Sequence, residues 1–183
     1  MLSKFIKDPG QRAIAGFLLK AVVVYILWFV SYDFFVAPDG RLDEWLNAKV
    51  AEHSAGILSL LGYQGSTAPG VAQTLIRIDN TVMVGVGNPC NGLELFALFT
   101  GFVLCFPGPW RNKWWFILLG VAGIHFINVL RATALALIQL KTPEYLDFNH
   151  HYTFTVVVYS FIFLLWVTWA NKFSKKDKQD TAS

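Results

Sequence analysis

The chain has 183 residues, of which 55% are hydrophobic and only 15% are charged, and its mean hydropathy is +0.46. Soluble domains contain about 45–50% apolar and about 25% charged residues, so this composition excludes an ordinary soluble domain and predicts a membrane protein. The net charge of +3 gives no reason to expect nucleic-acid binding, because the basic residues flank apolar runs. We expect one all-α membrane domain over 13–171, with a cytoplasmic N-terminus over 1–12 and a disordered cytoplasmic tail over 172–183.

About four apolar runs have the composition of transmembrane helices, and they cover roughly residues 13–35, 91–106, 114–140 and 152–170. The first run is too long for the apolar region of a signal peptide, so we expect a retained helix. The second run is short, since it gives roughly 24 Å of helix for a hydrocarbon core of about 30 Å. An even number of spans places both termini on the same side of the membrane.

The lysines and arginines predict which side that is. Most of them precede the first run, separate the second from the third, or follow the fourth: Lys4, Lys7, Arg12, Arg111, Lys113, Lys172, Lys175, Lys176 and Lys178. In a four-span bundle these segments share one side, and the positive-inside rule makes that side cytoplasmic. We therefore expect a protein of the cytoplasmic (inner) membrane with both termini inside and segment 36–90 on the outer, periplasmic face.

This outer segment contains two predicted elements. Residues 42–61 carry apolar side chains at helical spacing, which predicts an amphipathic helix lying at the membrane interface. Residues 75–86 are rich in β-branched side chains around an Asp79-Asn80 turn signal, which predicts a short β-hairpin that ends just before Cys90.

The two cysteines, Cys90 and Cys105, are expected to be free thiols because helical geometry separates them too far for a disulfide. Cys90 lies at the outer N-terminus of the second span, where free backbone N–H groups and the helix dipole favour a thiolate. Asn91 and Glu94 form a possible capping pair there. A small buried residue is the alternative interpretation for any single cysteine, and it fits Cys105, which has no polar neighbours in the sequence.

Arg131 lies deep in the third span, where a charge costs about 2.5–3.5 kcal/mol on insertion scales, so it needs a partner or a watery cavity. Asn128 lies one turn earlier on the same face. Snorkelling of Arg131 to the outer interface is the structural alternative. His150 and His151 occur where the outer loop enters the fourth span, and a histidine there can be the base that a cysteine nucleophile needs, although a solvated loop pair is also possible.

Cys90, Arg131 and His151 lie on three different spans, and the topology brings them towards one side of the membrane. A thiol nucleophile, a base and a cation for a developing oxyanion are the components of acyl transfer. The other two histidines, His53 and His125, are expected to be structural.

Three motifs carry a family resemblance: Asn-Pro-Cys90-Asn-Gly-Leu-Glu, Asn128-Val-Leu-Arg131, and the run from His151 to Tyr159. They resemble motifs of the exosortase/archaeosortase family over roughly residues 88–166. The resemblance implies a membrane cysteine transpeptidase that cleaves C-terminal sorting signals of exported proteins.

In that family pattern Cys90 is the nucleophile, Arg131 orients or stabilises, and His151 handles protons, with Asn128, His150 and Glu94 as supporting residues. The choice of His151 over His150 depends on the aromatic Tyr159, eight residues after His151. Two departures are visible. Thr155 stands where family members often have glycine, and many members have more spans.

Three other functions remain to be weighed. In a non-enzymatic assembly factor or transporter subunit, Arg131 would pair with Glu94 and Cys90 would be inert. A thiol–disulfide oxidoreductase is disfavoured because the chain has no C-x-x-C motif. A metal site is disfavoured because adjacent histidines cannot easily bind one ion. We expect no cofactor and no metal, and the expected partners are membrane lipid and exported proteins that end in a motif, a hydrophobic helix and a basic cluster.

Overall fold

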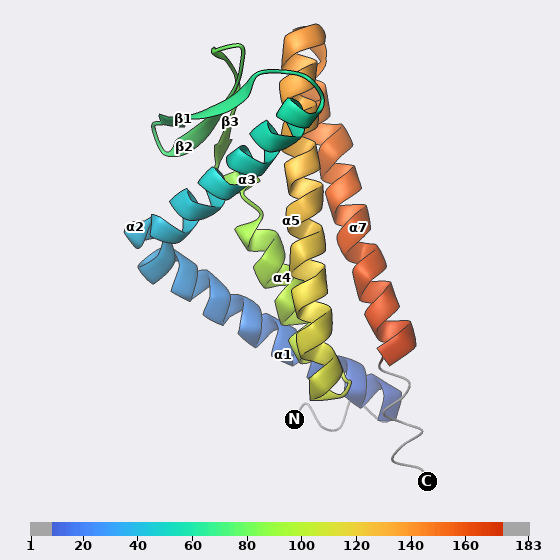
Figure 1. Cartoon of the computed structure of the whole chain (residues 1–183). Coiled ribbons are helices and arrows are strands. Elements are labelled where there is room, and N and C mark those ends of the chain that lie inside the picture. Colours follow the sequence, from blue (N-terminus) through green and yellow to red (C-terminus); the bar gives the residue numbers. More distant parts are fainter. Residues whose placement is uncertain (1–8, 174–183) are drawn as a thin grey trace.

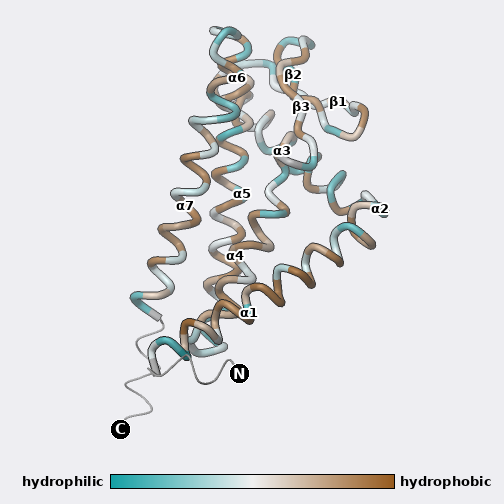
Figure 2. The backbone as a smooth tube through the Cα atoms, turned by 180° about the vertical axis from the view of Figure 1, so that it is seen from behind, coloured by the Kyte–Doolittle hydropathy of each residue, from teal (hydrophilic) through white to brown (hydrophobic). Residues whose placement is uncertain are grey.

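The computed structural model describes residues 9–173 of the chain (Figure 1). Three helical stretches in this part are long and apolar enough to cross a membrane: Gly10–Asp39, Trp110–Lys141 and Pro143–Lys172. Figure 2 shows apolar residues along most of their length, with hydrophilic residues at the end that carries the sheet. The chain is therefore an integral membrane protein.

The first stretch consists of α1 (Pro9–Ser31), the π-helical turn η2 (Tyr32–Val36) and α2 (Ala37–Asp39). The second stretch is the single helix α5 (Trp110–Lys141). The third consists of short helical turns followed by one long helix: η4 (Pro143–Tyr145), α6 (Leu146–Phe148), η5 (Asn149–Thr153), α7 (Phe154–Thr168) and η6 (Trp169–Phe173). In Figure 1, α5 and α7 run side by side, whereas α1 crosses obliquely.

The second predicted span, 91–106, is a shorter helix than expected. Helix α4 (Leu93–Cys105) has 13 residues, or about 20 Å of helix, which is less than the hydrocarbon thickness. It begins late because Asn88–Cys90 form a 3-10 turn, η3, and Gly92 has a left-handed conformation with φ of 89°. Four spans are therefore not confirmed: the described residues contain three candidates and this one short apolar helix.

Helices α4, α5 and α7 pack around a core of aromatic and branched side chains. Its buried members are Phe99, Val103, Ile117, Ile124, Val158, Ile162 and Trp169. Gly120 of α5 lets the ring of Phe99 from α4 approach the α5 backbone, where a Cβ would collide with the ring. This close packing holds α4 against α5, and it helps to fix the position of the residues just before α4.

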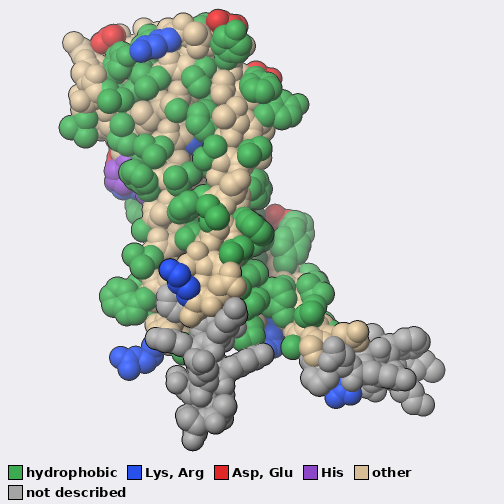
Figure 3. Space-filling view, turned by 90° about the vertical axis from the view of Figure 1, so that its right-hand side faces the viewer, with side chains coloured by type: hydrophobic (Ala, Val, Ile, Leu, Met, Phe, Trp, Pro, Cys, Tyr) green, Lys and Arg blue, Asp and Glu red, His purple; other side chains and the backbone are tan. Residues whose placement is uncertain are grey.

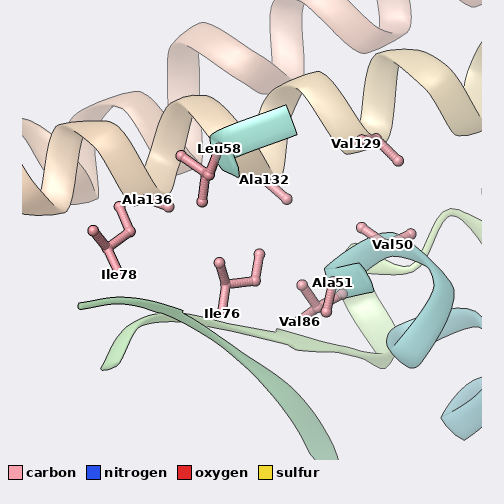
Figure 4. Packing of buried hydrophobic residues seen from close by; sticks show 9 residues of the cluster. All are labelled: Val50, Ala51, Leu58, Ile76, Ile78, Val86, Val129, Ala132 and Ala136. Atoms are coloured by element: carbon pink, nitrogen blue, oxygen red, sulfur yellow. The ribbon is translucent and has the colours of Figure 1, made fainter. Parts of the chain in front are cut away.

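The predicted amphipathic helix is present as α3 (Arg41–Leu60). Its buried face packs against α5 and the sheet, as Figure 4 shows for Val50, Ala51 and Leu58. Trp45 and Leu61, which the apolar spacing placed on that face, are 56% and 58% exposed. The real face is narrower because small residues form much of it, and small residues contribute little to an apolar pattern.

The predicted hairpin is confirmed by β2 (Gln73–Ile78) and β3 (Thr81–Gly87), which pair antiparallel. Its turn residues, Asp79 and Asn80, have φ of 50° and 63°, as a two-residue hairpin turn requires. A third strand, β1 (Gly65–Gly70), pairs with β2, so the sheet order is β1-β2-β3. This strand was not predicted, because its Pro69 and its two terminal glycines argue against a strand.

Charged side chains are distributed unevenly along the long axis. In Figure 3 the end near the sheet shows acidic side chains together with a basic one, while the opposite end shows only Lys and Arg among the coloured charged groups. Residues 1–8 and 174–183 lie outside the described part of the chain, and with them most of the predicted N-terminal segment and of the predicted tail.

Candidate active site

Cys90 lies in the 3-10 turn η3, between the end of β3 and the start of α4. Its side chain is half-buried and its thiol is free, as predicted; the thiol of Cys105 is also free, and Cys105 is buried at the other end of α4. The turn lies where the chain passes from the sheet to α4 (Figure 1). A cysteine in this position can be reached from the cavity described below.

Helix α5 contributes two side chains to the surroundings of Cys90. The Nδ2 group of Asn128 donates a 2.7 Å hydrogen bond to the main-chain carbonyl of Cys90. One turn later, Nη2 of Arg131 lies 3.8 Å from Sγ of Cys90. The structure thus brings together the cysteine and the two residues singled out in the third apolar run, because residues three apart on a helix share one face.

His150 is the histidine that faces Cys90, with Nε2 of its ring 3.5 Å from Sγ. His151, which the sequence pattern favoured, instead directs Nδ1 to the carboxylate and the carbonyl of Asp147, at 3.1 Å in each case, and its side chain is 60% exposed. Both histidines belong to the π-helical turn η5, where successive side chains point in different directions. Only one of them can therefore face the cysteine, and the spacing to Tyr159 did not identify which one.

A cavity of about 400 Å³ opens beside the sulfur, within the usual range of ligand pockets. Its walls come from β3, η3, α5 and the turns before α7, and they are mostly apolar around Cys90, Arg131 and His150. Two buried polar atoms at this site, Oδ1 of Asn128 and Nε of Arg131, have no hydrogen-bond partner among the described residues. Unpaired polar atoms are costly in an apolar setting, and they are common where a bound ligand supplies the missing partner.

A second group of polar residues holds the loop that carries Cys90. Asn91 is fully buried; its Nδ2 donates to the carboxylate of Asp43, and its Oδ1 accepts a 2.9 Å bond from the backbone N–H of Leu93. Asp43 also accepts a 3.1 Å bond from the hydroxyl of Tyr32. On the other side of the cysteine, Asn47 of α3 donates to Asn88 at 3.2 Å. Residues both before and after Cys90 are thus fixed to α3.

The sequence interpretation did not single out Asp43. Asp43 lies in the first turn of α3, where an exposed carboxylate is common because it interacts favourably with the helix dipole. A usable signal was present, however. Asp43 has helical spacing to Asn47, Val50 and Ser54, so it occupies the buried stripe of the helix, and a carboxylate on a buried stripe needs polar partners.

Glu94 does not line the Cys90 cavity. It lies on a second cavity of about 490 Å³ between α1, α4 and α7, with Asp33 and Tyr159 among its other lining residues. The described residues contain no ion pair between Glu94 and Arg131, which is the contact expected for a non-enzymatic assembly factor or transporter subunit.

The remaining histidines join two helices. Nδ1 of His53 on α3 and Nε2 of His125 on α5 lie 2.9 Å apart, as in a hydrogen bond. Between residues 9 and 173, no cluster of three or more His, Cys, Asp or Glu side chains could hold a metal ion.

Comparison with known proteins gives one match. Residues 10–168 match the family model described as transmembrane exosortase. No curated protein and no solved structure matches the chain. The matched region includes Cys90, Asn128, Arg131 and both neighbouring histidines.

Proposed function

Since the chain belongs to the transmembrane exosortase family, we propose that it is a membrane cysteine transpeptidase that uses Cys90 to cleave C-terminal sorting signals of exported proteins. One observation supports this most strongly: Sγ of Cys90 lies 3.5 Å from a ring nitrogen of His150 and 3.8 Å from the guanidinium of Arg131, at the wall of a cavity. A nucleophile, a base and a cation at one cavity match the needs of acyl transfer.

The proposed reaction has two steps. His150 accepts the thiol proton through Nε2 while Sγ attacks the carbonyl carbon of the substrate peptide, and Arg131 stabilises the negative charge that develops on the carbonyl oxygen. Collapse of this intermediate breaks the peptide C–N bond, returns the proton from His150 to the leaving amine, and leaves a thioester on Cys90. An amine or a water molecule then attacks the thioester and frees the thiol.

Asn128 and the loop contacts have a supporting role in this proposal. The hydrogen bond from Asn128 holds the main chain of Cys90, so the sulfur keeps its distance to both Arg131 and His150. A displacement of about 1 Å at a reacting atom can lower a rate about 10²-fold. Rigid placement of Cys90 is therefore part of the proposed function.

The hydrophobic segment of the substrate has a suitable place in the second cavity. Glu94, four residues after Cys90 on α4, lines this cavity, so the cavity begins next to the proposed cleavage site. Ala97 and Gly101 have little or no side chain, so they leave space along α4, and aromatic side chains of α1 and α7 form the walls. An apolar helix of the substrate can lie along α4 with its preceding residues near Cys90.

The uneven distribution of charge supports an orientation. The end that shows only basic side chains in Figure 3 is placed in the cytoplasm by the positive-inside rule, and the sheet end is placed outside. The proposed protein thus lies in the inner membrane with both termini cytoplasmic and with Cys90 towards the outer face. This fits exported proteins, whose folded parts are on that side.

The test is replacement of Cys90 in the native host. In a Cys90→Ala strain, exported proteins that end in a short motif, a hydrophobic helix and basic residues should accumulate as longer, membrane-held precursors. Cys105→Ala is the matched control, because its thiol is buried at the other end of α4, and processing should continue. Normal processing in the Cys90→Ala strain would sink the proposal and favour a non-enzymatic assembly factor.

A further inference from the structure

Strand β3 (Thr81–Gly87) is the edge strand nearest to Cys90. In the part of the chain that the structure describes, β3 pairs with β2 on one side and with no strand on the other. About half of the backbone N–H and C=O groups of an edge strand point away from the sheet and are available to a further strand. β3 ends three residues before Cys90, so its outer edge leads to the sulfur.

The Cys90 cavity lies along this outer edge. It is lined by four consecutive residues of β3, from Met83 to Val86. Successive side chains of a strand point to opposite faces of the sheet. A cavity that borders only one face would contact every second residue, whereas this cavity contacts Val84, Gly85 and Val86 in succession, all in regular register with β2, so it borders the edge itself.

The two edges of the sheet differ in their capacity to pair. The outer strand β1 contains Pro69, which has no backbone N–H to donate. β3 contains neither a proline nor a charged side chain, two features that often block pairing at an edge. Its one bulge, at Met83 opposite the Ile76–Arg77 step, lies in the half of the strand away from Cys90, and Val84 to Gly87 pair in regular register with β2. The sheet is thus protected at the edge far from Cys90 and open at the edge beside it.

We propose that the peptide substrate binds as an extended fourth strand along the outer edge of β3, which delivers the scissile carbonyl to Cys90. This inference rests on the proposed function and adds the way in which the substrate is held. Extended peptides bind open sheet edges through backbone hydrogen bonds, while pockets for alternate side chains set the sequence preference. The cavity wall opposite β3 includes Ala132, Leu135 and Leu146, so side chains directed to it are expected to be apolar.

The test uses the precursor that accumulates in the Cys90→Ala strain. A synthetic peptide covering both sides of its cleavage position is made as a series, with one backbone N–H at a time replaced by N–CH₃. Binding to the Cys90→Ala protein in detergent micelles is measured by fluorescence anisotropy. We expect the dissociation constant to rise about three- to tenfold at every second position, the effect of one lost hydrogen bond, and to stay unchanged at the positions between.

A second measurement locates the strand. Val84→Cys and Ser66→Cys, on β3 and β1, are each made in a Cys90→Ala, Cys105→Ala background and mixed with a peptide that carries one cysteine. Disulfide formation is expected with Val84→Cys and not with Ser66→Cys. An N-methyl series without alternation, or linkage at Ser66→Cys alone, would overturn the inference while leaving cleavage by Cys90 intact. If no precursor accumulates in the first place, the proposed function fails and this inference fails with it.

Discussion

Asn91, the residue that follows Cys90, donates a hydrogen bond to Asp43, whose carboxylate is 1% exposed. The bond joins the loop before α4 to the first turn of α3, two elements that are 48 residues apart in the sequence. Among the described residues, Asp43 forms no ion pair, so its buried charge is stabilised by hydrogen bonds from Asn91 and Tyr32. The position of Cys90 thus depends on a carboxylate that the reaction itself does not use.

The pair leads to a test by exchange. Asn91→Asp alone places a second buried carboxylate next to that of Asp43, and the two repel each other. This variant should lower the free energy of unfolding by about 3–5 kcal/mol and should abolish processing. Adding Asp43→Asn exchanges donor and acceptor. The amide introduced at position 43 donates to the carboxylate introduced at position 91, and that carboxylate still accepts from the N–H of Leu93. We expect the double variant to regain most of the stability and activity. Thermal unfolding in detergent and precursor processing measure the two effects.

Asp33→Asn combined with Asn91→Asp is the matched control for this exchange. Asp33 is also acidic and lies close in sequence to Tyr32, but its side chain lines the second cavity and is not bonded to Asn91. It should not rescue Asn91→Asp. Equal rescue by both changes would show that only net charge matters, contrary to the contact seen here.

Gly92 provides a test of the link between α5 and the cysteine. Its φ is 89°, and a Cβ at this position would lie 3.1 Å from Nδ2 of Asn128, the group that donates to the carbonyl of Cys90. Gly92→Ala should cost about 1–2 kcal/mol of stability through its left-handed backbone. It should also slow processing, because Asn128 must move away from Cys90.

Gly56→Ala is the comparison for this prediction. A Cβ at Gly56 meets nothing within 4 Å, and alanine in the middle of a helix is more stable than glycine by about 0.5–1 kcal/mol. Gly56→Ala should raise the melting temperature slightly and leave processing unchanged. If Gly92→Ala processes precursor at the wild-type rate, the hydrogen bond from Asn128 is not needed to place the cysteine.

The sequence predicted the local elements well because their signals are local. The hairpin was indicated by β-branched residues around Asp79-Asn80, and α5 and α7 by apolar runs of sufficient length. The run that forms α4 was predicted to be short, but its later start and the strand β1 were not predicted, because Gly92 and Pro69 act through backbone geometry that apolar patterns do not encode. The fold of this protein was thus predictable in outline, with its boundaries set by single residues.

The site could be predicted as far as its main residues but not as far as its contacts. Cys90, Asn128 and Arg131 stand out as polar residues in or beside apolar runs, so sequence alone selects them. The choice between His150 and His151 depends on the rotation of one helical turn, and the role of Asp43 depends on a contact between distant elements. Neither the rotation nor the contact can be read from a linear pattern.

The two histidines can be distinguished by kinetics. His150→Ala should lower kcat by about 10²–10⁴-fold, the usual contribution of a general acid–base group, because its Nε2 is 3.5 Å from Sγ. His151→Ala should change kcat little, since that ring contacts Asp147 and solvent. The measurement is the initial rate of precursor cleavage by each purified variant at saturating substrate. The reverse ranking would assign proton transfer to His151, as the sequence pattern suggested.

Arg131 can act on the thiol, on the substrate, or on both, and two rates separate these roles. Nη2 of Arg131 lies 3.8 Å from Sγ, close enough to affect how the sulfur reacts. Alkylation of Cys90 by iodoacetamide reports on the thiol alone, and it is measured in a Cys105→Ala background so that one thiol reacts. Arg131→Gln should slow alkylation and should lower kcat about 10²–10³-fold if the guanidinium also holds the oxyanion.

Arg131→Lys keeps the charge but loses the planar donor group, so it should preserve alkylation better than cleavage. A loss of cleavage with unchanged alkylation in Arg131→Gln would restrict Arg131 to the substrate, whereas unchanged rates for both reactions would remove it from the proposed mechanism.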